Sequence, residues 1–380
     1  MLEQSSPLKP LTAAKPVRLI FVGGFLGAGK TTAMGALARR LLQDGLNVGL
    51  VTNDHAEEMV DAALVRQFGM PVAEVSGGCF GCEFHELLDA TERVLMQEPD
   101  VLIAEPVASC ADTVATVIEP LRQFYGNLFH FSPFSVLIDP ARLYEMLLDE
   151  SPSEFARSFA PIFHQQLEEA DILVLNKIDK LSTEETQKLL GALRQRHPGK
   201  TVLAISAKRG DGIDEWMNLV MQDAPPGSHV LEKADYSAYE IGGVKLGWLN
   251  ASVQLVGEPP FNPREYAQML LRRLREAAVA RGSEVLHIKL AVHCQGRALG
   301  ASLLGSEAEP VFGGEDLGDV RQAMLVLNAR LGIDPPTLGG ICAQAIYDVA
   351  KALHIDAEIL RLHTVKPSVP CPAFRMCNPV

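Results

Sequence analysis

Short apolar runs alternate with stretches of helical periodicity as far as about residue 224. The runs are Arg18–Gly23, Val48–Thr52, Val101–Ala104, Ser135–Ile138, Ile172–Leu175 and Val202–Ile205. Each is nearly continuous in apolar residues and bounded by turn residues, as strands buried on both faces of a parallel sheet are. Segments with helical periodicity, such as Thr31–Asp44 and Thr183–Arg196, lie between them. The alternation predicts a doubly wound α/β domain over residues 18–224, after a loose tail at residues 1–17.

A second pattern begins after Pro225, Pro226, Gly227 and Ser228, which indicate a linker over residues 225–235. The sequence beyond it predicts strands at Leu246–Val256, Val285–His293 and Val320–Leu331 and helices at Pro263–Arg281 and Thr337–Leu353. We therefore expect a smaller α+β domain over residues 236–380, with a mostly antiparallel sheet.

The composition narrows the class of protein. Hydrophobic residues make up 47% and charged residues 21% of the 380 residues, a balance typical of globular proteins. The formal net charge of −13 leaves no basic surplus to neutralise phosphates, which argues against binding nucleic acid or an anionic membrane. Residues 1–17 lack the apolar core of a signal peptide, and the charge-free run Gln123–Ile138 is too interrupted to span a membrane. We expect a cytosolic protein.

The segment Gly24–Thr31 matches the P-loop pattern G-x-x-x-x-G-K-[ST] at every fixed position. It follows a predicted strand and opens a predicted helix, which is the context that a P-loop requires. Its glycines allow successive backbone N–H groups to face phosphates at the helix N-terminus. Lys30 is expected to reach the β- and γ-phosphates, and the Thr31 hydroxyl to bind Mg²⁺.

A second motif identifies the base. Asn176-Lys177-Ile178-Asp179 directly follows the strand Ile172–Leu175, and an Asp carboxylate there can accept two hydrogen bonds from guanine. Adenine would leave that carboxylate unpaired, so GTP is favoured over ATP. Ser206-Ala207-Lys208 follows the next strand, where a loop contacting the guanine carbonyl is expected. The predicted GTP contacts are Gly24, Gly27, Ala28, Gly29, Lys30, Thr31, Thr32, Asn176, Lys177, Asp179, Ser206, Ala207 and Lys208.

Two acidic residues are candidates for hydrolysis. Glu105 ends the strand Val101–Ala104, where P-loop enzymes hold Mg²⁺ or its water, and Asp54 follows the strand Val48–Thr52. Each could instead be a surface acid at a strand end. We predict Lys30, Glu105 and Asp54 as catalytic residues, with Thr31 and Glu105 at Mg²⁺.

A cysteine pair indicates a second site. Seven cysteines scattered over the chain do not form a disulfide framework, but Cys79-Phe-Gly-Cys82 can bind one Zn²⁺ or similar ion, with His85 close enough to join. Cys110, five residues after Glu105, is a further candidate ligand. The alternatives are two buried small side chains in a Gly-rich turn, or a redox pair. Cys371 and Cys377, with His363 upstream, fit no standard ligand spacing, and we predict no second metal site there.

Together these motifs resemble the CobW family, which contains metal-chaperone GTPases. The resemblance rests on Gly23–Thr32, the Gly-Gly-Cys79 segment, Glu105 and Asn176–Asp179, and it extends from about Leu19 to the C-terminus. Glu284–Lys289, Asn328–Arg330 and Pro370–Arg375 look like parts of the family's C-terminal domain. The resemblance implies a GTP-gated carrier in which nucleotide orders switch loops that complete a thiolate site, and hydrolysis releases Zn or Co to a client protein.

The sequence departs from the family pattern at two positions. The family's Cys-x-Cys-Cys reads Cys79-Phe80-Gly81-Cys82 here, which removes one thiolate unless Cys110 or His85 replaces it. The family's Glu-x-x-Gly reads Glu105-Pro-Val-Ala108, and alanine tolerates fewer backbone angles than glycine. Hydrolysis, or its coupling to the switch, is therefore expected to differ.

Other functions are consistent with the same motifs. One alternative is a GTP-dependent maturation or reactivation chaperone of a corrinoid-dependent enzyme, which would act by docking. Another is a nucleotide-gated metal reservoir or sensor with little turnover, which Gly81 and Ala108 favour. A small-molecule kinase is the least favoured, since the guanine motifs are intact.

Overall fold

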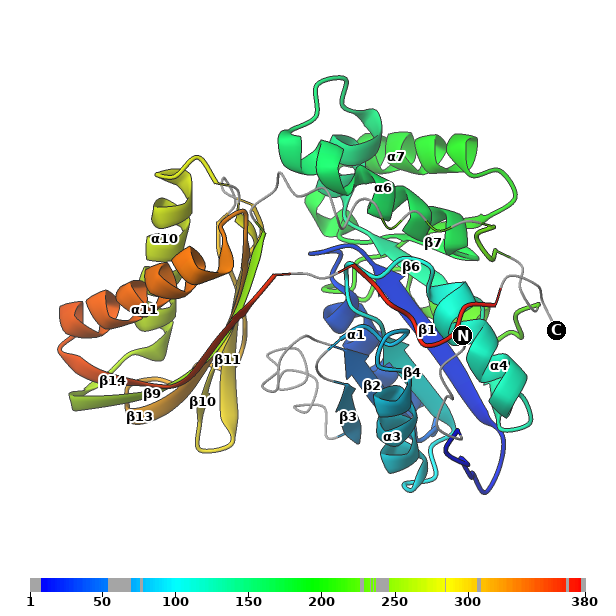
Figure 1. Ribbon diagram of the computed structural model, residues 1–380, viewed down its shortest axis with the longest axis horizontal. Coiled ribbons are helices and arrows are strands. Elements are labelled where there is room, and N and C mark those ends of the chain that lie inside the picture. The colour runs from blue at the N-terminus through cyan, green and yellow to red at the C-terminus, as the bar shows by residue number, and fades with distance from the viewer. Residues whose placement is uncertain are drawn as a thin grey trace, which may run out of the picture. The chain divides into compact units, whose positions relative to one another are not determined.

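The computed structural model describes residues 8–53, 70–75, 78–225, 229–232, 234, 236, 246–283, 285–305, 309–366 and 369–376. The chain divides into two compact units (Figure 1). The first comprises Met1–His55, Val65–Ala238 and Pro370–Val380, and the second comprises Ala56–Leu64 and Tyr239–Val369. The last described residues of the chain therefore belong to the first unit and not to the second.

The first unit is built on a sheet in which every described pair of strands is parallel. Its strands are β1 (Val17–Gly24), β2 (Val48–Asn53), β3 (Val72–Val75), β4 (Val101–Glu105), β5 (Phe129–Phe131), β6 (Ser135–Ile138), β7 (Ile172–Leu175) and β8 (Thr201–Ala204). They lie in the order β3-β2-β4-β1-β6-β7-β8, and β5 also pairs with β1. The predicted doubly wound parallel sheet is confirmed. The short strands β3 and β5 were not predicted, because each is interrupted by a polar residue and forms no continuous apolar run.

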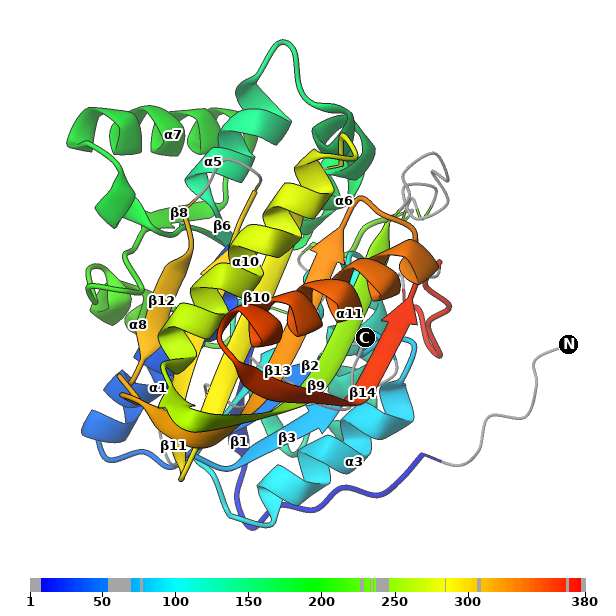
Figure 2. The same ribbon diagram turned by 90° about the vertical axis from the view of Figure 1, so that its left-hand side faces the viewer.

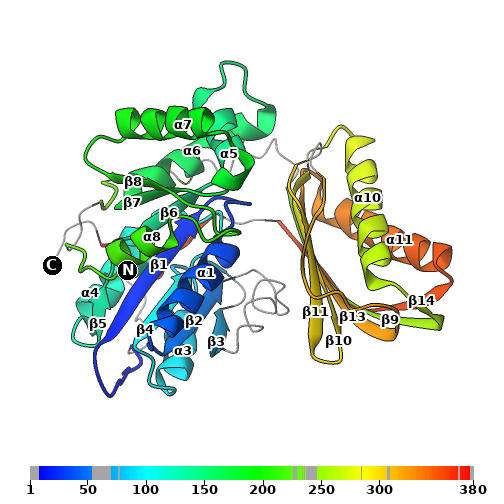
Figure 3. The ribbon, with the colours of Figure 1, turned by 180° about the vertical axis from the view of Figure 1, so that it is seen from behind.

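Helices cover both faces of this sheet. They are α1 (Lys30–Gln43), α3 (Phe84–Leu95), α4 (Glu119–Tyr125), α5 (Pro140–Leu143), α6 (Glu154–Glu169), α7 (Thr183–Arg196) and α8 (Ile213–Val220), with short turns of π-helix at Val114–Ile118 and Tyr144–Leu148. Helices α1 and α8 lie on one face (Figure 3), and α3 and α4 lie on the other (Figure 1). Ile20 and Leu50 of the sheet share a buried core with Leu37 of α1 and Trp216 of α8.

Helix α7 has the bounds that the sequence predicted, and its cap explains why. The Ser182 hydroxyl accepts from the Glu185 amide, and the Glu185 carboxylate accepts from the Ser182 amide. This reciprocal pair satisfies two amide groups that the first turn would otherwise leave unpaired.

The strand order locates the binding edge of the sheet. Strand β1 lies between β4 and β6, so connections run to opposite sides from it. Ligands of such sheets bind beyond the carboxyl ends of the strands at this reversal. The residues at these ends include Gly24 at the end of β1, Glu105 at the end of β4, Asn176 after β7 and Ser206 after β8.

The second unit is a six-stranded antiparallel sheet with two helices on one face (Figure 2). It contains β9 (Gly247–Phe261), α10 (Pro263–Val279), β10 (Val285–Cys294), β11 (Arg297–Leu303), β12 (Val311–Gly314), β13 (Val320–Leu331), α11 (Pro335–Ala352) and β14 (Ile355–Val365), with strand order β12-β11-β10-β13-β9-β14. The predicted antiparallel α+β architecture is confirmed. Three strands of this unit were not predicted. β12 and β14 are largely exposed edge strands without an apolar run, and β11 is an interior strand whose small residues make only a weak apolar pattern. No described helix is long and apolar enough to cross a membrane.

Candidate functional site

The P-loop is held by close backbone approach. Gly29 has φ of 87°, in the left-handed region, and a Cβ atom there would lie 2.6 Å from the Asn176 amide nitrogen. Gly24 has φ of 135°, and a Cβ atom there would lie 2.4 Å from the Leu137 carbonyl oxygen. Both positions therefore require glycine. The turn ends at Lys30, where α1 begins, so the free N–H groups of the helix face the loop.

Lys30, Thr31 and Glu105 come together at the phosphate end. The Lys30 ammonium donates to the Gly24 carbonyl at 3.0 Å and lies 3.5 Å from a Glu105 carboxylate oxygen. The Thr31 hydroxyl donates to the other Glu105 oxygen at 3.3 Å. Lys30 and Glu105 are 7% and 5% exposed. A hydroxyl beside a buried carboxylate is an all-oxygen donor set, which fits Mg²⁺, and the Mg²⁺ would neutralise charge on the β- and γ-phosphates.

The guanine loop is tied directly to the P-loop. The Asn176 amide donates to the Ala28 carbonyl at 2.8 Å and accepts from the Ala207 N–H at 3.1 Å. Lys177, at φ of 61°, donates to the Gly27 carbonyl and pairs with Asp139 at 2.7 Å. Burial opposes ionisation of Asp139, but the charge and hydrogen bond of Lys177 and the N–H groups of Ala141 and Arg142 together hold the pKa of this carboxyl below its usual range.

Asp179 and Ser206 form the end of this loop pair. The Ser206 hydroxyl donates to the Asp179 carboxylate at 2.7 Å, and Ser206 is fully buried. This bond orients the Asp179 carboxylate, which the sequence predicts as the acceptor for guanine. Lys208 is exposed beside it. The predicted base and phosphate contacts thus lie on loops, at the end of β1 and in the first turn of α1, all at one edge of the sheet.

Two polar residues at this edge were missed by sequence reasoning. Asn53, the last residue of β2, donates to the Val75 and Gly78 carbonyls at 3.1 and 2.7 Å and accepts from the Val107 N–H at 3.2 Å. It therefore joins the loop before Cys79 to the loop after Glu105. Asp139, the second, directly follows the strand Ser135–Ile138. That position, after a buried strand, could have predicted a side chain at this edge of the sheet.

Asp54, the other predicted catalytic acid, lies outside the described residues, and so do Ser76 and Gly77. Ala108 adopts a φ outside the left-handed region, so alanine is unstrained at this position in this structure. Its carbonyl accepts from the Gln166 amide at 3.0 Å, and the same amide donates to the Cys110 carbonyl at 2.7 Å. Gln166 therefore holds the loop that leaves β4.

The predicted cysteines gather in one cluster. Cys79 and Cys110 are buried with Val107, and half-buried Cys82 packs against them. The Cys79 and Cys82 sulfur atoms lie 3.1 Å apart, and all three thiols are free. Hydrogen bonding to Cys110 and burial raise the pKa of Cys79 to about 12, and hydrogen bonding to Cys79 raises the pKa of Cys82. Cys79 and Cys82 are therefore neutral thiols near pH 7 and pack as small apolar groups.

The donor chemistry of this cluster fits a thiophilic ion, because thiols that meet a cation lose their protons and become strong ligands. His85 does not complete the cluster, since it is exposed on α3. Within the described part of the chain, no group of three or more cysteine, histidine or acidic side chains is spaced to hold a metal ion as it stands. The thiols would have to move apart around an ion.

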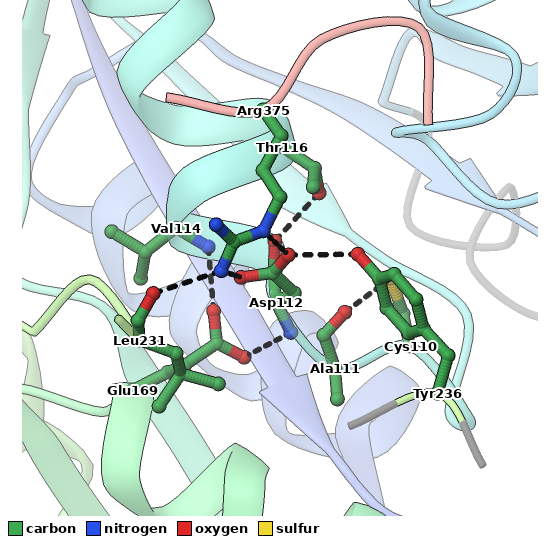
Figure 4. Close-up of polar contacts among 9 residues, drawn as sticks. All are labelled: Cys110, Ala111, Asp112, Val114, Thr116, Glu169, Leu231, Tyr236 and Arg375. Atoms are coloured by element: carbon green, nitrogen blue, oxygen red, sulfur yellow. Dashed lines mark hydrogen bonds and ion pairs between the residues drawn. The ribbon is translucent and has the colours of Figure 1, made fainter. Parts of the chain in front are cut away.

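The loop that carries Cys110 is fixed from below by Glu169, the last residue of α6 (Figure 4). The Glu169 carboxylate accepts from the N–H groups of Asp112 and Val114 at 2.6 and 2.8 Å. Complete burial, opposed in part by these bonds, raises the pKa of Glu169 to about 8. Asp112 itself has φ of 66° and is fully buried.

Comparison with known proteins gives matches that centre on the nucleotide-binding half of the chain. The family model described as CobW/HypB/UreG, nucleotide-binding domain, matches residues 18–204. The Zinc chaperone CobW of Pseudomonas aeruginosa is 27% identical over 243 residues, which cover 55% of this chain and 60% of that protein. The Zinc chaperone YeiR of Escherichia coli is 29% identical over 181 residues, which cover 45% of this chain and 50% of that protein.

The chain thus spans between half and three fifths of the length of these curated relatives. Among solved structures, the match to the Zn(II)-bound YjiA GTPase from E. coli covers 87% of this chain and 99% of the YjiA chain, at 16% identity and a TM-score of 0.38.

Proposed function

Residues 18–204 belong to the CobW/HypB/UreG family of nucleotide-binding domains, and on that premise we propose that the protein is a GTP-hydrolysing metallochaperone. It binds a transition metal, Zn²⁺ or Co²⁺, under control of the nucleotide and delivers it to a client protein. The observation that carries the proposal is the loop after β4, which begins at Glu105 on the phosphate side and reaches Cys110 in the thiol cluster five residues later.

The nucleotide half of the proposal rests on the joined loops. Asn176 and Lys177 hold the guanine loop on the P-loop, and Ser206 orients Asp179. A carboxylate in that position pairs with the ring N–H and exocyclic amine of guanine. Lys30 and Mg²⁺, held by Thr31 and Glu105, would stabilise charge on the phosphates during attack by water.

The metal half rests on the thiols. Cys79, Cys82 and Cys110 supply soft donors, which select Zn²⁺ or Co²⁺ over Mg²⁺ or Ca²⁺. We favour Zn²⁺, because two of the relatives are named zinc chaperones. Asn53 provides a second link between the two halves, since it bonds both to Gly78, next to Cys79, and to Val107 on the loop after Glu105.

A titration of Zn²⁺ into the full-length protein tests the proposal. Zn²⁺ affinity is measured by competition with a chromophoric chelator in reducing buffer, with GTPγS, GDP or no nucleotide. We expect an affinity that depends on the nucleotide and falls in Cys82→Ser. The matched control is Cys294→Ser, which changes a half-buried cysteine of the second unit. An affinity that ignores both the nucleotide and Cys82→Ser rules the carrier out.

Gly81, which lacks the family's middle thiolate, favours the alternative of a nucleotide-gated reservoir with little turnover. GTP turnover decides between them: a carrier releases phosphate at a rate that Zn²⁺ loading changes, whereas a reservoir binds Zn²⁺ and turns over negligibly in every state. The chaperone of a corrinoid-dependent enzyme differs from both, because its docking would survive Cys82→Ser.

A further inference from the structure

The C-terminal segment, Pro370–Met376, lies beside the thiol cluster of the first unit. Its backbone is bonded at three points: Cys371 N–H donates to the Cys82 sulfur at 3.2 Å, Ala373 N–H to the Gly81 carbonyl at 2.8 Å, and Met376 N–H to the Ala115 carbonyl at 2.9 Å. These bonds place the segment directly over the Cys79–Cys82 turn.

Aromatic packing adds a fourth attachment. The Phe374 ring lies edge-on to Phe84 of α3, with ring centroids 5.1 Å apart, and to Phe124 of α4, with centroids 5.4 Å apart. Aromatic pairs at such distances are stabilising beyond the apolar area they bury. The segment is therefore packed against two helices as well as hydrogen-bonded.

Gly81 makes room for this segment. A Cβ atom on Gly81 would lie 2.8 Å from the Thr116 hydroxyl oxygen and 3.5 Å from Cβ of Pro372. Thr116 is itself fixed, because it is buried and its hydroxyl donates to the Asp112 carbonyl at 2.6 Å. The space that a side chain at position 81 would need is thus taken by Thr116 and bordered by the segment.

Arg375 anchors the segment to the loop that carries Cys110 (Figure 4). Its guanidinium contacts both carboxylate oxygens of Asp112, at 2.7 and 3.3 Å, and donates to the Leu231 carbonyl at 2.8 Å. The Tyr236 hydroxyl donates to the same carboxylate at 2.8 Å. A fork-shaped pair with a fully buried carboxylate fixes both distance and orientation.

We propose that Cys371 supplies a thiolate to the metal site, in place of the one that Gly81 lacks, and that Arg375 is the residue that positions it. The proposal rests on the proposed function, because it names a further ligand for the same Zn²⁺. Cys371 is exposed, and its own N–H already bonds the Cys82 sulfur. Its sulfur would take the place of the missing thiolate beside Cys79 and Cys82.

Each thiol of Cys79, Cys82 and Cys371 that becomes a metal ligand gives its proton to solvent. No oxidation or reduction occurs in this step. The amide N–H of Cys371 then donates to a thiolate, an outer contact of the kind that orients metal ligands. Cys110 remains in the cluster and can fill a further position around the ion.

The test is a Zn²⁺ and Co²⁺ titration of full-length wild type, Cys371→Ser, Arg375→Gln and Arg375→Lys, with Cys294→Ser as the matched control. Two quantities are measured: Zn²⁺ affinity, and the intensity of the thiolate-to-Co²⁺ charge-transfer band, which scales with the number of thiolates. We expect Cys371→Ser to lower affinity by about tenfold or more and to remove one thiolate's share of the band. Arg375→Gln should lower both, and Arg375→Lys should restore part of each.

The outcomes separate this proposal from the one it rests on. If Cys371→Ser leaves affinity and band unchanged while Cys82→Ser lowers both, Cys371 is not a ligand and the metallochaperone proposal stands. If wild type binds neither ion in any nucleotide state, the metallochaperone proposal itself fails. Circular dichroism of each variant checks that the loss is not unfolding, and Gly81→Ala, which should displace the segment through Thr116, provides an independent variant expected to lower affinity.

Discussion

The side-chain amide of Asn176 donates to the carbonyl oxygen of Ala28 at 2.8 Å, across 148 residues of sequence, so the base-recognition loop and the phosphate loop form one rigid surface. The same side chain accepts from the Ala207 N–H and is 1% exposed. The two loops proposed to hold the base and the phosphates are therefore already fixed relative to each other, which lowers the ordering cost of binding.

Asn176→Ala should weaken this surface. It leaves a buried carbonyl and a buried N–H without their partner, at a cost of about 1–3 kcal/mol each. We expect a lower melting temperature and a weaker stabilisation by GTP, both measured by thermal unfolding with and without nucleotide. The control is Asn47→Ala at an exposed position. An unchanged response to GTP would contradict the role of Asn176.

Asp179→Asn should change the base that is bound. The amide cannot accept from both guanine nitrogens, whereas it can donate to the additional carbonyl of xanthine. We expect GTP affinity to fall by on the order of a hundredfold, which corresponds to about 2.7 kcal/mol, and XTP affinity to rise. Titration of a fluorescent analogue of each nucleotide measures both. Retained preference for GTP would show that Asp179 does not read the base.

Glu105→Gln should separate binding from hydrolysis. The neutral amide still occupies the place beside Lys30 and Thr31 but holds Mg²⁺ and its water poorly. We expect nucleotide affinity within a few-fold of wild type and a phosphate release rate lower by on the order of a hundredfold. The assay is single-turnover phosphate release at saturating Mg²⁺. A rate close to wild type would remove Glu105 from the hydrolytic machinery.

Glu169 should make stability depend on pH. Its folded pKa of about 8 lies above the ordinary value of 4.5, so between these limits the folded state holds a proton that the unfolded state has lost. The stabilisation that the protonated Glu169 gives the folded state is therefore complete below about pH 4.5 and is lost as pH rises through about 8. This loss is on the order of a few kcal/mol. Asp112, whose charge faces Glu169 and pairs with Arg375, reinforces the upward shift.

Chemical denaturation between pH 5 and 9 measures this dependence. We expect the free energy of unfolding to fall with rising pH in wild type and to fall less steeply in Glu169→Gln. Glu168→Gln, one residue away on α6, is the matched control. Parallel curves for wild type and Glu169→Gln would refute the assignment.

Local pattern was sufficient for the regular elements and for the nucleotide motifs. The bounds of α7 follow from a capping box, and those of β13 follow from a long, largely apolar run centred on Ala323–Leu327. The P-loop and the Asn176–Asp179 motif were likewise recognisable from the sequence, because their chemistry requires particular residue types at fixed short spacing. The missed strands are β3, β5, β11, β12 and β14. All but β11 are short or lie at sheet edges, where local propensity is weak, and the interior strand β11 is decided by burial between its neighbours.

The sequence by itself determined the doubly wound sheet, the GTP-type motifs and the presence of a Cys-x-x-Cys turn. Only the tertiary structure decided what surrounds that turn. Asp112 and Arg375 are separated by 263 residues, and Cys82 and Cys371 by 289, so no periodicity or spacing connects them. Buried charge and polar backbone must find partners wherever the fold brings them, and here those partners come from the end of the chain. The C-terminal segment carries no recognisable ligand spacing, so only its contacts in the folded structure allow us to assign it to the metal site.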